Sequence, residues 1–139
     1  MNAVFADTLY WIATARPGDP WSSAARQARQ SVGESQLVTT DEVLVEFLSS
    51  MAKGSAAVRR TAVQMVRAIL SDPQVRVITQ SHEGFLEALS LFENRPDKHY
   101  SLTDCRSMSV MKSESIERVL SNDKHFEQEG FQALIKRTP

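Results

Sequence analysis

Short apolar runs alternate along the chain with longer segments in which apolar residues recur at helical spacing. The short runs predict strands at 2–6, 36–39, 75–79, 117–121 and 132–135. The longer segments predict helices at 8–15, 20–32, 41–53, 55–72, 81–95 and 101–115. Because strands that alternate with helices pair in parallel and are covered on both faces, the pattern predicts an α/β fold. We expect a three-layer α/β/α sandwich around a mainly parallel sheet of four or five strands.

The segment 41–53 gives the clearest helical signal. Its apolar side chains at helical spacing are Val43, Leu44, Phe47, Leu48 and Met51. Thr39 and Glu42 have the spacing of a capping box at the start of this helix. Farther along the chain, the Asn-Asp pair at 122–123 predicts a turn, and 125–131 predicts a short connection.

Composition limits the class of protein. The 139 residues fit one domain, so we expect a single domain over 1–139. The formal net charge of -1 argues against a protein that binds nucleic acid through a general basic field. Cys105 is the one cysteine, so no internal disulfide is possible. No apolar run approaches the roughly 20 residues of a membrane span, and no signal-peptide pattern opens the sequence, so we expect a cytoplasmic protein without membrane contact.

Four acidic residues lie where a site could form on such a sheet. Asp7 ends the first predicted strand, and Asp123 lies just past the strand at 117–121. Ligand sites in open parallel sheets form outside the carboxyl ends of the strands, so these two carboxylates converge if their strands are neighbours. Glu46 lies on the flank of the apolar stripe of its helix, and Asp104 lies in the first turn of the helix at 101–115.

Each acid also has a structural explanation. Asp7 could simply end a strand, and Glu46 could be a solvated helix residue. Asp104 could complete a capping box with Ser101 and interact favourably with the helix dipole. Asp123 follows an asparagine, which is ordinary turn chemistry. No single acid decides between structure and function.

The four acids taken with their neighbours resemble a known family. The stretches that carry the resemblance are VFADT (4–8), TTDEVLVEFLS (39–49), YSLTDCRSMSVMK (100–112) and RVLSNDKHFEQEGF (118–131). Together they resemble the PIN-domain ribonucleases, and among these the VapC-type toxins of toxin–antitoxin pairs. The pattern departs from the family at Leu9, where many members carry a small polar residue. This departure affects a secondary polar contact and leaves the acidic residues in place.

The resemblance implies a metal-dependent endoribonuclease whose catalytic residues are Asp7, Glu46, Asp104 and Asp123. We expect Mg²⁺ (or Mn²⁺) as the cofactor, because such ions prefer oxygen ligands. Asp7 and Asp104 would be the principal ligands, and Asp123 would bind the metal directly or through water. Glu46 would act through water or orient the nucleophile. The metal would activate water and stabilise charge on an RNA phosphodiester.

Four carboxylates in one site repel each other. Without metal, we therefore expect at least one of them to have a raised pKa from like-charge repulsion. Thr8 and Asn122 could hydrogen-bond a ligand or a phosphate, or could serve only as turn and cap residues.

Other residues with chemical potential have structural explanations. His125 follows the predicted turn and could contact RNA, but a role in packing or in a loop is favoured. Cys105 lacks an adjacent base and is expected to be a small buried helix residue. Trp11 and Trp21 flank the first loop, and either could belong to the core or to a partner surface.

The resemblance also implies partners. We expect an RNA substrate, a homodimer, and a cognate antitoxin that inserts a segment, with a basic side chain, into or beside the acidic groove. A catalytically silent PIN-fold RNA-binding or scaffold module is the alternative. A phosphoacceptor receiver-like domain also gathers acids at strand ends, but it needs an aspartate after a middle strand, and VRVITQ (75–80) has none.

Overall fold

Five strands and seven helices alternate in the computed structural model, which describes residues 2–136. The strands are β1 (Ala3–Ala6), β2 (Gln36–Thr40), β3 (Val75–Ile78), β4 (Arg118–Leu120) and β5 (Gln132–Ala133). The helices are α1 (Thr8–Ala15), α2 (Ser22–Ser31), α3 (Asp41–Ser50), α4 (Ala56–Ser71), α5 (His82–Asn94), α6 (Leu102–Ser113) and α7 (Lys124–Gln128). The domain expected over 1–139 thus includes four residues, 1 and 137–139, that lie outside the described range.

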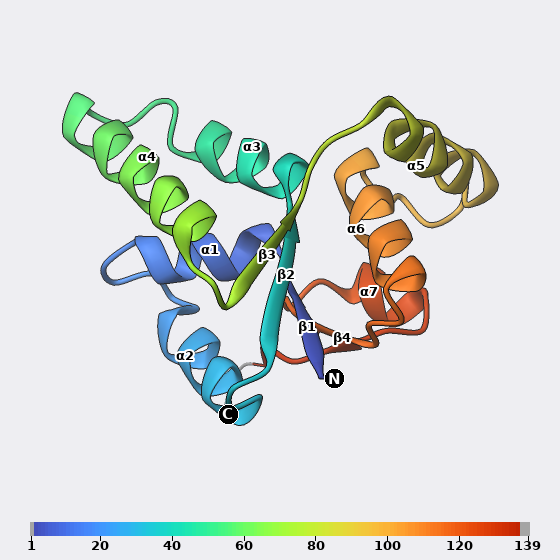
Figure 1. Cartoon of the computed structure of the whole chain (residues 1–139), viewed down its shortest axis with the longest axis horizontal. Coiled ribbons are helices and arrows are strands. Elements are labelled where there is room, and N and C mark those ends of the chain that lie inside the picture. The colour runs from blue at the N-terminus through green and yellow to red at the C-terminus, as the bar shows by residue number, and fades with distance from the viewer. Residues whose placement is uncertain (1, 137–139) are drawn as a thin grey trace.

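All five strands form one sheet in the order β3-β2-β1-β4-β5, and every neighbouring pair is parallel. In Figure 1, α1 to α4 lie on one side of the sheet and α5 to α7 lie on the other. The predicted α/β/α sandwich with a parallel sheet is therefore confirmed. In the described part of the chain, no helix has both the length and the apolar character needed to cross a bilayer.

The middle strand, β1, lies in the centre of the core. Its residues Val4, Phe5 and Ala6 have no exposed surface. A strand that is covered on both faces needs a continuous apolar run instead of alternation, which is what the sequence has at this point. Burial fixes β1 in place and with it the direction of the residue that follows, Asp7.

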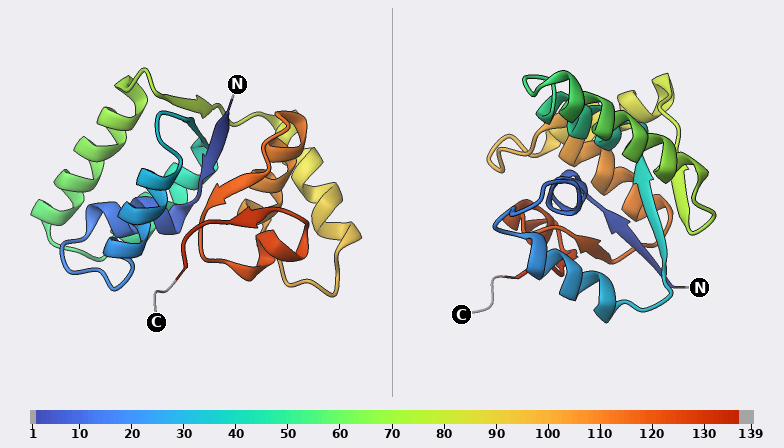
Figure 2. Two further views of the ribbon diagram at one scale, coloured as in Figure 1. Left: turned by 90° about the horizontal axis from the view of Figure 1, so that it is seen from below. Right: turned by 90° about the vertical axis from the view of Figure 1, so that its left-hand side faces the viewer.

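The two neighbours of β1 determine where the connections between strands reverse direction, which is called the switch point of the sheet. The chain runs from β1 to β2 on one side, and β4 pairs with the other side, with Phe5 opposite Val119 and Ala6 opposite Leu120. Figure 2 shows β1 (blue) between β2 (cyan) and β4 (orange). A crevice opens at the carboxyl ends of the strands where connections leave in opposite directions. The backbone N–H of Asp7 donates to the Leu120 carbonyl across this point (3.3 Å).

The sheet order also corrects one inference from the sequence. The strand at 75–80 that lacked an aspartate is β3, which lies at an edge of the sheet. The middle strand is β1, and Asp7 follows it directly. The stated reason against a receiver-like domain is therefore wrong, because a middle strand of this sheet does end in an aspartate.

The segment after β4 is helical where a short connection was predicted. The Asp123 side chain accepts a hydrogen bond from the His125 backbone N–H (2.9 Å) and so caps α7. The Phe126 side chain is fully buried and anchors this helix, and Gly130 ends it with a φ of +93°. Asp123 is thus a helix cap instead of a turn residue.

The capping of α3 also differs from the prediction. The helix is capped by Thr40, whose side chain accepts from the Val43 backbone N–H (3.1 Å). Thr39 still belongs to β2 and points into the core, where its hydroxyl donates to the Ala6 carbonyl (2.9 Å) and accepts from the Trp11 indole (3.4 Å). The predicted capping box with Thr39 is therefore wrong. The capping residue is Thr40, because the strand β2 continues to Thr40.

A buried ion pair joins α3 to α6. The Arg106 guanidinium donates to the Glu42 carboxylate (3.0 Å) and to the Thr79 carbonyl (3.3 Å). Gly84 of α5 lies directly against the guanidinium, where a Cβ atom would come within 2.6 Å of it. The pair therefore fixes the two helices that carry Glu46 and Asp104 relative to each other.

Breaking this pair from one side should destabilise the protein more than removing both partners. Arg106→Leu should lower the free energy of unfolding in urea by about 3 kcal/mol, because Glu42 keeps a largely buried charge without its partner. Glu42→Leu combined with Arg106→Leu should recover most of that loss. The Arg76–Glu114 pair supplies the control, because the Arg76 side chain is 52% exposed and Arg76→Leu should therefore have a much smaller effect. A double variant as unstable as Arg106→Leu alone would contradict this interpretation.

Candidate active site

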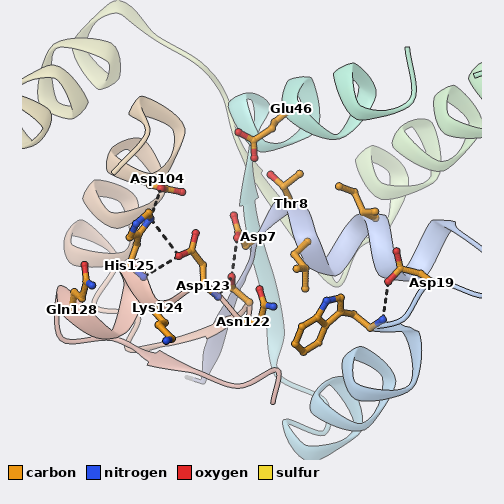
Figure 3. A pocket seen from close by; sticks show the side chains of 14 residues that line it. Asp7, Thr8, Asp19, Glu46, Asp104, Asn122, Asp123, Lys124, His125 and Gln128 are labelled. Atoms are coloured by element: carbon orange, nitrogen blue, oxygen red, sulfur yellow. Dashed lines mark hydrogen bonds and ion pairs between the residues drawn. The ribbon is translucent and has the colours of Figure 1, made fainter. Parts of the chain in front are cut away.

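A cleft of about 650 Å³ opens at the carboxyl ends of β1 and β4. Figure 3 shows side chains from α1, α3, α6 and α7 pointing into it. It contains all six residues predicted from the sequence, namely Asp7, Thr8, Glu46, Asp104, Asn122 and Asp123. The predicted convergence of the acids is therefore present, while their individual roles in catalysis stay predictions.

Asp7 is held by a hydroxyl that the sequence interpretation missed. The Ser121 hydroxyl donates to the Asp7 carboxylate (2.9 Å) and accepts from the Asp123 backbone N–H (3.1 Å). Ser121 is fully buried at the end of β4, next to the end of β1. One side chain thus ties the buried acid to the start of the loop that carries Asp123. Its position directly before the Asn-Asp pair at 122–123 is the sequence feature from which this role could have been predicted.

Burial raises the pKa of Asp7 to about 7. Only 7% of this residue is exposed, and desolvation penalises its charged form most. The hydrogen bonds to Asp7 oppose this rise in pKa, while the charges of Asp104 and Glu46 add to it. The expectation of a raised carboxyl pKa is therefore confirmed, but like-charge repulsion is a smaller cause than burial.

Asp104 combines a structural role with a place in the cleft. Its carboxylate accepts from the Ser101 backbone N–H (3.0 Å), and the Ser101 hydroxyl accepts from the Asp104 backbone N–H (3.0 Å). The predicted capping box is therefore confirmed. The same carboxylate oxygen lies 3.2 Å from Nδ1 of His125. The box thus orients Asp104 toward the cleft instead of competing with a role there.

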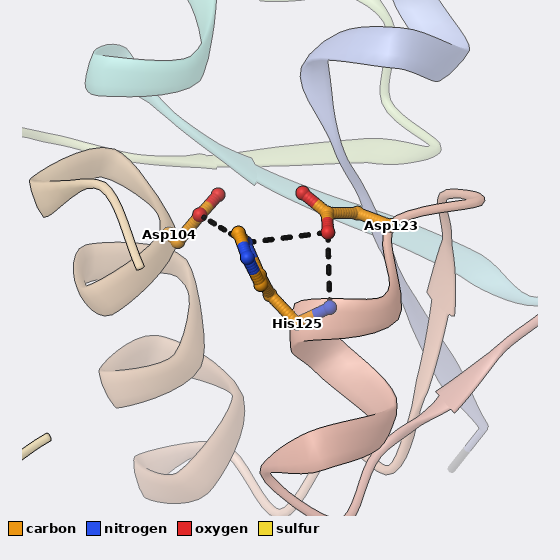
Figure 4. Close-up of side chains that lie close together, drawn as sticks. All are labelled: Asp104, Asp123 and His125. Carbon is orange, nitrogen blue, oxygen red and sulfur yellow. Dashed lines mark hydrogen bonds and ion pairs between the residues drawn. The ribbon is translucent and has the colours of Figure 1, made fainter. Parts of the chain in front are cut away.

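His125 bridges two of the acids (Figure 4). Its Nδ1 lies 3.2 Å from Asp104 Oδ2 and 3.3 Å from Asp123 Oδ1. Atoms of these three side chains that could bind a metal lie within 4.8 Å of one another. The expectation of a packing or loop role for His125 missed this contact, because it depends on α7, which the sequence interpretation did not predict.

A second network holds His125 from outside the cleft. The Tyr100 ring packs edge-on against the imidazole with 5.3 Å between ring centroids, and its hydroxyl donates to Glu129 (3.0 Å). Arg95 and Lys112 also donate to Glu129 (3.0 Å each). Although burial opposes ionisation of Glu129, these hydrogen bonds lower its pKa to about 2. The carboxylate therefore stays charged and joins the end of α7 to α5 and α6.

The three remaining predicted residues also line the cleft. Glu46 lines it from an exposed position on α3. Thr8 is buried, and its hydroxyl oxygen has no hydrogen-bond partner among the described residues. A buried hydroxyl without a partner is costly, so Thr8 is suited to hydrogen-bond a group that enters the cleft. Asn122 also lines the cleft.

The donor set fits a divalent metal ion. Asp104, Asp123 and His125 offer two carboxylates and an imidazole within one small volume, and the partnerless Thr8 hydroxyl lies in the same cleft. Asp7 lines the cleft but does not belong to that 4.8 Å group of described residues. Its assignment as a principal metal ligand therefore stays a prediction.

Comparison with known proteins identifies the family of this fold. The PIN domain family model matches residues 4–131. Among solved structures, VapC20 of Mycobacterium tuberculosis, described as a Sarcin-Ricin loop cleaving toxin, is 24% identical with a TM-score of 0.81. The match covers 92% of this chain and 95% of that one. FitAcB from Neisseria gonorrhoeae is 12% identical with a TM-score of 0.65, and 96% of each chain is covered. No curated protein sequence matches the chain.

The raised pKa of Asp7 predicts how the metal-free protein responds to pH. Because the folded state holds this proton more tightly than the unfolded state, stability should fall as the pH rises from about 4 to about 7. Asp7→Asn removes this contribution. In the presence of a chelator, its stability advantage over the wild type should therefore grow across that range, to a few kcal/mol, and stay constant above it.

Urea unfolding at several pH values measures this difference. Asp97→Asn, which changes an acid with a 75% exposed side chain, should follow the wild type at every pH. An unchanged difference between Asp7→Asn and the wild type across the range would show that Asp7 has an ordinary pKa.

Proposed function

Because the chain belongs to the PIN domain family, we propose that it is a divalent-metal-dependent endoribonuclease, acting in the cytoplasm as the toxin of a toxin–antitoxin pair. The observation that carries the proposal is the meeting of Asp7, Glu46, Asp104 and Asp123 in one cleft at the switch point of the sheet. A structural carboxylate cluster would have no reason to gather acids from four separate segments around a cleft. The structural match to a toxin supports the same biological role.

Different residues of the cleft would have different roles in phosphodiester hydrolysis. Asp104, Asp123 and His125 would hold Mg²⁺ or Mn²⁺, with Asp7 as a further candidate ligand. A bound ion supplies Lewis acidity and a more acidic water. Glu46, at the opposite side of the cleft, would orient the attacking water.

Two further residues of the cleft would position the substrate and the acids. Thr8 would donate its hydroxyl to a phosphate oxygen, which would give its buried oxygen a partner. Ser121 would keep the Asp7 carboxylate in place through its 2.9 Å hydrogen bond.

The proposal requires a cation in the cleft before RNA can enter. Carboxylates and a phosphodiester repel each other, and a divalent ion reverses the sign of the local field. The same field would attract a basic side chain. We therefore propose that a cognate antitoxin inhibits the enzyme by inserting such a side chain into or beside the acidic end of the cleft.

Removing a proposed ligand should abolish both metal binding and cleavage. Asp104→Asn should lower the rate of RNA cleavage in Mg²⁺ or Mn²⁺ at least about 100-fold, since weaker perturbations of metal sites already cost 10- to 100-fold. Its affinity for Mn²⁺, measured by electron paramagnetic resonance, should fall in parallel. Asp97→Asn is the matched control, because this acid is exposed and lies outside the cleft.

Two results would separate the proposal from its alternative. Cleavage by Asp104→Asn at the wild-type rate would contradict the proposal of metal-dependent catalysis at this site. RNA binding without cleavage, in the presence of bound Mn²⁺ and across a broad set of RNAs, would favour a catalytically silent RNA-binding or scaffold module.

We also propose a homodimer that uses the outer face of α5. Four large apolar side chains on this helix are between 44% and 49% exposed, namely Phe85, Leu86, Leu89 and Phe92. The opposite face of α5 packs against α6 through small residues, Gly84 and Ala88. An exposed apolar face of this kind is typical of an interaction surface.

Charge on this face should break the dimer. Leu89→Glu together with Phe92→Glu should shift the mass measured by light scattering after gel filtration from dimer to monomer, because burying two carboxylates costs more than the apolar contact supplies. Leu70→Glu on α4, where the side chain is 56% exposed, should leave the mass unchanged. A monomeric wild type would contradict the proposed dimer.

A further inference from the structure

Three basic side chains gather around the carboxyl-terminal end of α3. The Arg16 guanidinium, at the end of α1, donates to the Ser50 carbonyl (3.4 Å), and the Arg59 guanidinium of α4 donates to the Ala52 carbonyl (2.7 Å). Lys53 follows in the turn that leads to α4. Arg16, Lys53 and Arg59 are all exposed, and we call them the basic cluster. The cluster thus unites cations from three separate segments of the chain.

The basic cluster has no acidic partner among the described residues. Residues 47–71 contain no aspartate and no glutamate. Asp19 is the acid nearest to Arg16 in the sequence, and its carboxylate accepts from the Trp21 backbone N–H (2.8 Å). In the part of the chain that the structure describes, none of the three cations forms an ion pair.

The helix dipole of α3 explains only part of this concentration of charge. Cations near the carboxyl-terminal end of a helix are favourable because they interact with its unpaired carbonyl groups. That end carries the equivalent of about half a negative charge, whereas each side chain of the cluster carries a full positive charge. Most of the positive charge is therefore available to an anionic ligand.

The cluster lies about one helical turn beyond the cleft on two helices. Ile12 of α1 and Glu46 of α3 line the cleft. Arg16 and Ser50 follow them by four residues, which corresponds to about 6 Å along the same face of a helix. The helices α1 and α3 pack together, and in Figure 3 both run away from the acids on the same side of the cleft. The two helices therefore lead from the acidic cleft to the basic cluster.

The cleft itself offers little positive charge to RNA. Lys124 is the one lysine or arginine among the described residues that line it. With a net charge of -1, the chain also lacks a general basic field. Contacts with phosphate groups supply much of the affinity of proteins for nucleic acids. An RNA strand in the cleft therefore gains most from cations that lie just outside it.

We infer that the basic cluster binds phosphate groups of the RNA backbone on one side of the scissile bond. This inference rests on the proposed ribonuclease function and adds to it a second contact, outside the cleft. An arginine guanidinium can donate two parallel N–H groups to a phosphate, and a lysine acts as a point charge. Such contacts position a nucleic acid without reading its sequence. The cluster holds the strand while the cleft acts on one bond.

The salt dependence of RNA binding tests this role. The probe is a single-stranded RNA oligonucleotide, and Asp104→Asn serves as the cleavage-deficient background. Each phosphate contact of a single strand adds about 0.7 to the slope of log affinity against log salt concentration. The triple variant Arg16→Gln, Lys53→Gln, Arg59→Gln should therefore reduce the magnitude of this slope by about 2. Lys53→Gln alone should reduce it by about 0.7 and keep the fold, because Lys53 is exposed in a turn.

A control variant separates the cluster from the overall charge of the protein. Arg67, Lys98 and Lys136 lie outside both the cleft and the cluster. Changing all three to Gln removes the same number of charges and should leave the slope unchanged. Polyglutamate serves as a second probe, because it is an acidic polymer without phosphate.

The place of the cluster beside the cleft has its own test. Oligonucleotides extended to either side of a mapped cleavage site should differ, because the cluster lies on one side of the cleft. The triple variant should lose affinity for one extension and keep it for the other. In the protein with Asp104 intact, the triple variant should raise KM and leave the rate at saturating RNA unchanged.

Four results would overturn the inference. An unchanged salt slope in the triple variant, with cleavage by the wild type, would overturn it while the ribonuclease proposal stands. An equal loss in the control variant would show that no particular cations are involved. Loss of polyglutamate binding with unchanged RNA binding would assign the cluster to an acidic protein partner. Absence of cleavage by the wild type would contradict the proposed function, and with it the place of the cluster beside a scissile bond.

Discussion

The pairing of β1 with β4 is the contact on which the rest of the site depends. It brings residue 7 beside residue 121, across more than a hundred positions of sequence, and the Ser121 hydroxyl completes the join with a hydrogen bond to Asp7. A shift of this register by one residue would turn each side chain to the other face of the sheet. Such a shift would separate the Asp7 carboxylate from the Ser121 hydroxyl, so their hydrogen bond depends on the observed pairing of Phe5 with Val119 and of Ala6 with Leu120.

Two carboxylates of this molecule have pKa values shifted in opposite directions, although burial raises the pKa of both. Asp7 is buried with the Ser121 hydroxyl and the Thr8 backbone N–H beside it, and burial raises its pKa to about 7. Glu129 receives hydrogen bonds from two cations and a phenol, and its pKa is lowered to about 2. The first carboxylate has no cationic partner among the described residues, whereas the second has two. Asp7 is therefore easily protonated, whereas Glu129 stays charged and serves as a structural joint.

Much of this architecture could be predicted from the chain alone, because apolar periodicity and buried runs report directly on helices and central strands. The convergence of Asp7 and Asp123 followed from strand ends and parallel pairing. The order of strands could not be predicted, so β3 was treated as a middle strand although it lies at the edge. The helix α7 could not be predicted because five residues are too few to show a helical repeat of apolar positions. Its stability comes from the Asp123 cap and the buried Phe126. His125 was undervalued for the same reason.

The order in which the site residues occur along the chain has a consequence for synthesis. Asp7 is made almost first, whereas Asp123 and His125 are on a short helix near the end of the described chain. That helix is held by Glu129 through side chains on α5 and α6. A ribosome-bound chain that stops before this region has Asp7 but lacks Asp123 and His125, two of the three residues that cluster with Asp104. On the proposed ribonuclease function, the nascent chain would gain activity only after α7 has left the ribosome and packed against α6.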